Sequence, residues 1–127
     1  MMTEKTLYTE KKHVGTTEYT LQVNLSLPEG FLTDTTGHFN RLYISFDGED
    51  EGPRKQNEVV LEHPEFPVGI PIRGLGRDVT LVVVYRFRYF HKDTPENKME
   101  SIIRYNIPVR FDGDQDEVHL NKILPIE

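Results

Sequence analysis

The sequence predicts an all-β protein, and three observations support this prediction. Apolar and polar residues alternate with period two over several long segments, which is typical of strands with one buried face. Eight prolines and nine glycines are spread along the 127 residues and separate these segments. Strong helix signals are missing. We therefore expect an antiparallel two-sheet β-sandwich of about seven to eight strands, in one domain covering residues 1–127.

The alternating segments give the expected strands. The clearest is 18–27, in which Leu21, Val23 and Leu25 share one face and Gln22 and Asn24 the other. A strand at 6–14 precedes it. The other expected strands are 38–46, 57–62, a brief edge strand at 70–73, and then 78–90, 100–111 and 118–126.

Residues 78–90 and 100–111 form the strongest predicted hairpin. Alternate residues from Val79 to Tyr89, and from Ile103 to Phe111, are apolar or aromatic. Pairing Tyr85 with Tyr105 brings almost all of these core residues opposite one another. The same register sets Arg86 directly opposite Arg104, and like charges in that position destabilise a sheet unless something offsets them.

The outer face of this hairpin is the first candidate site. Arginines there are mixed with apolar side chains, a composition typical of protein interfaces. We expect a protein partner, or a second copy of the chain, to dock on it; an anionic ligand such as phosphate is the alternative. A purely structural interpretation has carboxylates from Glu100 or from residues 57–62 neutralise the arginines. The candidate partner-binding residues are Arg86, Arg88, Phe90, Ile102, Arg104 and Arg110.

Two acidic loops, at residues 47–51 and 112–117, form the second candidate site. Carboxylates that alternate along a turn can converge on a hard cation such as calcium, which takes six to eight oxygen ligands. The alternative function is therefore a calcium-binding or anionic-membrane-binding sandwich. The helix–loop–helix calcium pattern does not fit, and acidic turns also serve simply to keep strand ends solvated. The candidate metal ligands are Asp47, Asp50, Asp112, Asp114 and Asp116.

Composition argues against several classes of function. The net charge of −6 disfavours nucleic-acid binding, and the lack of cysteine excludes disulfides, thiolate catalysis and cysteine-ligated metals. The first residues show no signal peptide and no apolar run reaches the length of a membrane span, so we expect a cytoplasmic protein without a transmembrane segment.

Catalytic motifs are also missing. The three serines lie outside any Gly-x-Ser-x-Gly elbow, and no glycine-rich phosphate loop occurs. The five histidines are scattered and are interpreted as surface residues. We expect a non-catalytic protein without a cofactor other than a possible calcium ion, with a small hydrolase that uses a carboxylate site as a distant alternative.

The strand count and the patterning resemble an immunoglobulin-like or similar Greek-key sandwich. The resemblance is one of pattern alone, because the chain contains neither the cysteines nor the tryptophan that mark true immunoglobulin domains. The acidic loops and the basic strand face also look like those of the calcium-dependent, membrane-binding sandwiches of the synaptotagmin type. That resemblance assigns no ligand to any residue of this sequence.

Overall fold

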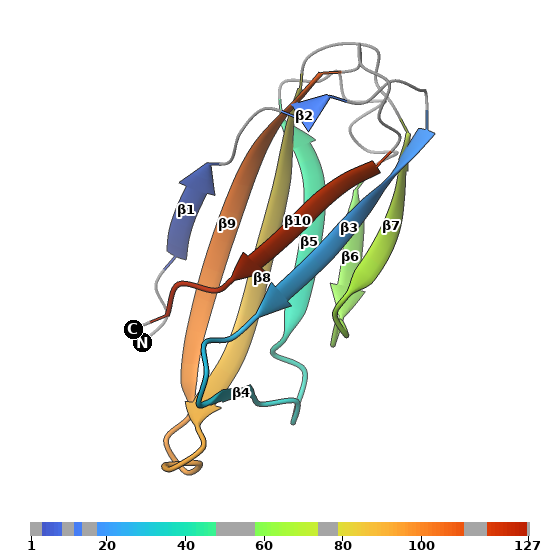
Figure 1. The fold of residues 1–127 in the computed structure, drawn as a ribbon. Helices are drawn as coiled ribbons and strands as arrows, with labels where there is room; N and C mark the ends of the chain where they lie inside the picture. Colours follow the sequence, from blue (N-terminus) through green and yellow to red (C-terminus); the bar gives the residue numbers. More distant parts are fainter. Residues whose placement is uncertain are drawn as a thin grey trace.

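The computed structural model describes residues 4–8, 12–13, 18–47, 58–73, 79–110 and 117–126. These residues form ten strands and no helix (Figure 1). In chain order the strands are β1 (Glu4–Tyr8), β2 (Lys12–His13), β3 (Glu18–Ser26), β4 (Phe31–Thr33), β5 (Arg41–Asp47), β6 (Val59–Glu62), β7 (Val68–Arg73), β8 (Val79–His91), β9 (Met99–Arg110) and β10 (Glu117–Ile123).

The strands form two sheets. The larger has the order β1-β9-β8-β5-β6, with β2 also paired to β9 and β4 to β8, and the smaller has the order β10-β3-β7. Figure 1 shows the smaller sheet lying across one face of the larger. The expectation of an all-β, two-sheet chain is therefore confirmed.

The expectation of purely antiparallel sheets is wrong. β1 and β2 both run parallel to β9, and β10 runs parallel to β3. Both sheets are mixed for this reason, although β8 is antiparallel to each of its neighbours β4, β5 and β9. Alternation in the sequence identifies the buried face of a strand, but it carries no information on the direction of the neighbouring strand.

Most strands lie where the alternation placed them. The expected first strand appears as two shorter pieces, β1 and β2, and β7 begins at Val68, two residues before the expected 70. β4 was not expected. It forms because a turn, closed by a hydrogen bond from Phe31 N to Pro28 O, brings Phe31 opposite His91 at the end of β8. Gly30 supplies the positive φ of 92° that this turn requires.

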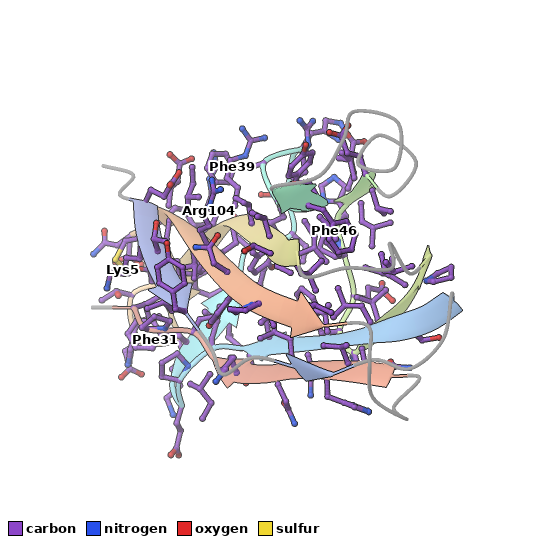
Figure 2. The ribbon with its side chains drawn as sticks, turned by 90° about the horizontal axis from the view of Figure 1, so that it is seen from above. Lys5, Phe31, Phe39, Phe46 and Arg104 are labelled. Carbon is purple, nitrogen blue, oxygen red and sulfur yellow. The ribbon has the colours of Figure 1, made fainter. Side chains whose placement is uncertain are left out.

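The core lies between the two sheets. Alternate residues of the central strands are almost completely inaccessible to solvent, and one buried cluster joins residues of both sheets. Leu21, Val23 and Leu25 of β3 contribute from the smaller sheet, as the alternation predicts. Figure 2 shows the two layers seen from above, with Phe46 of β5 between them.

The register of the long hairpin differs from the expected one by two residues. Tyr85 pairs with Ile103 rather than with Tyr105, so Arg86 lies opposite Ile102 and Arg104 lies opposite Val84. A shift of two residues leaves every side chain on its predicted face, which is why the core assignment survives. The observed register places Arg88 opposite Glu100, so that opposite charges face each other at this position.

Candidate functional site

The predicted partner-binding residues lie on the face of the larger sheet that points away from the smaller sheet. Arg86, Arg88 and Phe90 come from β8, and Ile102 and Arg104 from β9. Each of these five side chains is half-buried. Figure 2 shows Arg104 and Phe39 on this outer side. For the sixth residue, Arg110, the structure describes the backbone at the end of β9 but not the side chain.

Arg86 does oppose another arginine, but this residue is Arg41 of β5 and not Arg104. Arg41 pairs with Glu62 of β6, at 3.1 Å from its guanidinium to Oε1. The Nε atom of Arg41 is buried and has no hydrogen-bond partner among the described residues. The predicted pairing of Arg86 with Arg104 is therefore wrong, and a different like-charge pair, Arg86 and Arg41, lies across β8 and β5.

Phe39 organises two of the arginines. The guanidinium carbons of Arg86 and Arg88 lie 4.7 and 4.9 Å from the centre of the Phe39 ring, within the range of cation–π attraction. Arg86 also donates from Nε to the backbone carbonyl of Phe39 at 3.0 Å. Arg88 donates from Nε to Glu100 Oε2 at 3.0 Å. The side chains of Arg86 and Arg88 are thus fixed in position on the sheet.

The structural interpretation of the hairpin arginines holds for Arg88, whose charge is paired with Glu100. Arg41, which was not part of that interpretation, is paired with Glu62. Arg86 differs. Its described contacts are a carbonyl oxygen and an aromatic ring, and none of the described carboxylates forms an ion pair with it. A carbonyl and a ring stabilise a guanidinium without neutralising it. Among the described residues, no carboxylate therefore cancels the charge of Arg86.

The segment before β5 is held against β8 by a buried asparagine. Asn40 accepts a hydrogen bond from Arg88 N at 2.8 Å and donates to Asp34 O at 2.9 Å. Asp34 N in turn donates to Arg88 O at 2.8 Å. These bonds replace the strand ladder where β4 has ended and β5 has not begun. They also carry Phe39, the residue next to Asn40, to its place beside the arginines.

The side chain of Asp34 accepts hydrogen bonds within the same turn. Its Oδ1 accepts hydrogen bonds from the hydroxyl of Thr36 at 2.7 Å and from Thr36 N at 3.0 Å. The Thr36 hydroxyl, followed by the Thr36 backbone N–H, lowers the pKa of Asp34 below its ordinary value because both bonds favour the carboxylate. The turn therefore gains stability from an ionised Asp34.

Apolar side chains continue the outer face across four strands. One cross-strand row runs from Arg104 through Val84 and Tyr43 to Val60. Val60 is 50 % exposed. In the next row Ser45, Val82 and Asn106 also point outward, yet all three are buried. The accessible part of the predicted surface is thus its Phe90 end rather than the whole hairpin.

We use the name arginine face for this accessible part of the larger sheet. Its members are outward-pointing side chains of β5, β6, β8 and β9, together with Phe39: Phe39, Arg41, Tyr43, Val60, Val84, Arg86, Arg88, Phe90, Ile102 and Arg104.

The sequence reasoning missed the contributions of Phe39, Asn40, Arg41 and Tyr43. The alternation over 38–46 already placed Arg41 and Tyr43 outward, because Leu42, Ile44 and Phe46 occupy the core. Their place beside the hairpin was not predictable, because it depends on β5 pairing with β8 over a long stretch of intervening chain. No pattern in the sequence indicated that Phe39 would contact two arginines.

The proposed calcium ligands cannot be assembled from the described residues. Asp50, Asp112, Asp114 and Asp116 lie outside them, and Asp47 is described only through its backbone in β5. Within the described part of the chain, no group of three or more His, Asp or Glu side chains is placed to hold a metal ion. Calcium binding remains a hypothesis from the sequence.

Two of the histidines, which the sequence left scattered, come together. His38 Nδ1 and His63 Nε2 lie 3.2 Å apart, and the ring centres are 5.3 Å apart. They are neighbours because the turn before β5 meets the residue that follows β6. Their separation of 25 residues along the chain gave no signal of this contact.

A shallow hollow of about 200 Å³ lies on the outer face of the smaller sheet. Amide side chains and one imidazole supply its polar groups, from Gln22 and Asn24 of β3 and from His119 and Asn121 of β10. Pro67, Val23 and Leu120 complete the lining. The residues that line it include no carboxylate, hydroxyl or amine, so the hollow has no pair of groups for acid–base or nucleophilic chemistry.

Comparison with known proteins gives no relative: no family model matches the chain, and a search of curated proteins finds no significant match. In the part of the chain that is described, no helix is long and apolar enough to cross a membrane. The geometry of the molecule is therefore the basis for a functional proposal.

Proposed function

We propose that this chain is a non-catalytic binding module that docks an acidic, extended segment of a partner protein on the arginine face. The observation that carries the proposal is the uncancelled charge of Arg86, on a half-buried sheet face that also presents apolar side chains. Partner surfaces with carboxylates complement such a face.

Charge supports the choice of an acidic segment. The whole chain carries a formal net charge of −6, whereas the arginine face gathers Arg41, Arg86, Arg88 and Arg104 on adjacent strands. Glu62 and Glu100 pair with Arg41 and Arg88, which leaves the face cationic at Arg86. A local cationic surface in an acidic protein favours an anionic partner.

The fixed geometry of the arginines also supports binding. Long, flexible side chains lose rotamer freedom when a partner immobilises them. Arg86 and Arg88 are already held by Phe39 and Glu100, so part of that entropy cost is met on folding. Tyr43, Ile102 and Val84 lie beside them and offer the apolar contact that dominates the energy of most interfaces.

We further infer that the two sheets follow an immunoglobulin-like plan. The order β9-β8-β5 matches the sheet of the seventh, sixth and third strands in that plan, and the pair β3-β7 matches its second and fifth strands. β6 then extends the first sheet, as in the variable-type plan. The difference is that β10 lies beside β3, where the first strand of that plan pairs.

Binding of synthetic peptides tests the proposed function. The probes are labelled glutamate-rich peptides that contain leucine and tyrosine, with counterparts in which glutamine replaces every glutamate. Fluorescence anisotropy with the wild-type protein should show binding of the acidic peptides alone, weakening as salt is added. The variant Arg104→Glu should lose it, because it reverses the charge within the arginine face.

Lys122→Glu is the matched control, since it makes the same charge change at an exposed position of the smaller sheet. We expect this variant to bind as the wild type does. Equal weakening by both substitutions, or equal binding of glutamate and glutamine peptides, would show that the arginine face is not a specific site.

A further inference from the structure

The pair formed by His38 and His63 is a feature that the proposed function does not use. His38 is exposed and His63 is half-buried, with 3.2 Å between His38 Nδ1 and His63 Nε2. The two rings are tilted by 58° to each other. Two imidazole nitrogens at this distance either share one proton in a hydrogen bond or stand where a single metal ion can contact both.

The backbone fixes the relative position of the two residues. His63 N donates to Asn40 O at 3.1 Å, which ties His63 to a residue two positions from His38. Asn40 is itself bound to Arg88 N and to Asp34 O. His63 has a φ of 51°, a left-handed conformation in which asparagine, aspartate and histidine are enriched among the non-glycine residues. The fold therefore brings the two residues next to each other.

The distance suits a tetrahedral zinc ion. Zinc binds imidazole nitrogen at about 2.0–2.1 Å, and two such ligands at the tetrahedral angle are about 3.3 Å apart. The observed separation of 3.2 Å is close to that value. We propose that His38 and His63 form an exchangeable Zn²⁺ site, in which Nδ1 of His38 and Nε2 of His63 bind the metal.

The rest of the coordination shell follows from the surroundings. No third His, Asp or Glu among the described residues joins this pair to complete a metal site. In the proposed site water occupies the remaining positions, and zinc bound by two protein ligands exchanges readily with solution. Zinc takes the place of the proton that the two nitrogens share, and this proton moves to the other nitrogen of its own ring. Each ring thus binds zinc as a neutral imidazole, and binding must weaken in acid.

The site is separate from the arginine face, although the same segments build both. His38 precedes Phe39, and His63 follows Glu62, the partner of Arg41. Neither histidine contributes a contact to Arg86 or Arg104 among those the structure describes. Failure of zinc binding therefore leaves the peptide-binding proposal untouched, and the reverse also holds.

Titration of the tag-free protein with zinc chloride, followed by calorimetry near neutral pH, tests this proposal. We expect saturable binding of one zinc ion to the wild type. His38→Asn and His63→Asn should each lose it; asparagine is chosen at position 63 because it tolerates the left-handed backbone. His119→Asn is the matched control, at an exposed position on β10, and should bind zinc as the wild type does.

Thermal melting supplies a second measurement. Zinc should raise the melting temperature of the wild type and of His119→Asn, but not of the two variants of the pair, since a ligand of the native state stabilises only a protein that binds it. The acidic residues of the chain are the same in all four proteins, so any zinc they hold cancels in the comparison. A pair variant that binds zinc as strongly as the wild type does, or a wild type that binds no more zinc than the pair variants, overturns the proposal.

Discussion

At the scale of single residues, Asn40 decides how the chain passes from β4 to β5. It is 4 % exposed and uses both ends of its amide, one for Arg88 N and one for Asp34 O. Leaving a buried backbone N–H or C=O without a partner costs free energy, because water does not reach the group to replace the lost hydrogen bond. This one side chain therefore substitutes for the strand pairing that is missing at Arg88, and it holds Phe39 beside the arginines.

Asn40→Ala should lower the free energy of unfolding by about 2 to 3 kcal/mol, because it removes two hydrogen bonds and leaves buried polar groups without partners. Urea denaturation followed by circular dichroism measures the change. Asn121→Ala, at an exposed position of β10, should change stability by less than about 0.5 kcal/mol. Comparable effects of the two substitutions would contradict the role given to Asn40.

Tyr85 carries a residue-scale prediction for alkaline pH. Burial raises the pKa of Tyr85 from 10.0 to about 12, because the phenolate would lose its hydration in the core. Burial also raises the pKa of Tyr105. A raised folded-state pKa gives stability that is fully present below pH 10 and is lost as the pH rises through 12.

Wild-type protein should therefore lose stability between pH 10 and 12 more steeply than Tyr85→Phe, by about 2 to 3 kcal/mol across that interval. Denaturant melts at a series of pH values provide the measurement. Tyr8→Phe is the control, because Tyr8 is 76 % exposed and should leave the steepness unchanged. Parallel pH curves for wild type and Tyr85→Phe would refute this account.

At the scale of elements, β10 shows that the residue pattern of a strand does not predict the direction of the strand beside it. Val118 and Leu120 are buried, as alternation requires, while His119 and Asn121 point to solvent. The strand was expected in an antiparallel sheet, but it pairs in parallel with β3 from Glu117 to Ile123. Its pairing with β3 and the burial of Val118 and Leu120 in the shared core join it to the fold.

Leu120→Ala should destabilise the protein by about 2 to 4 kcal/mol, because it leaves a cavity between the sheets at a position that is 2 % exposed. Ile123→Ala shortens an apolar side chain of the same strand, but this position is 70 % exposed. The substitution should therefore lower the free energy of unfolding by less than about 0.5 kcal/mol. Chemical denaturation of both variants gives the comparison. A similar loss in the two would mean that β10 does not close the core.

At the scale of the whole molecule, the two sheets enclose one core and turn their other faces outward. The larger sheet presents the arginine face, and the smaller presents amides and one imidazole around a shallow hollow. The arginine face is therefore cationic and apolar, whereas the side chains that line the hollow include no carboxylate, lysine or arginine. Lys122→Glu in the smaller sheet can therefore serve as the control for Arg104→Glu on the arginine face.

The sequence by itself determined that the chain is all-β and which side chains face the core. It did so because successive side chains of a strand point to opposite faces, so residues at every second position must be apolar where that face packs against the core. The outward placement of Arg86, Arg88, Phe90, Ile102 and Arg104 followed from the same repeat.

Only the tertiary structure decided the pairing partners: the two-residue shift of the hairpin, the parallel direction of β10, the place of Arg41 opposite Arg86 and the contact between His38 and His63. A shift by two residues, or a change of neighbour, leaves every buried face buried, so local patterning is the same in each alternative. Packing between the sheets and hydrogen bonds across long stretches of chain select one of them.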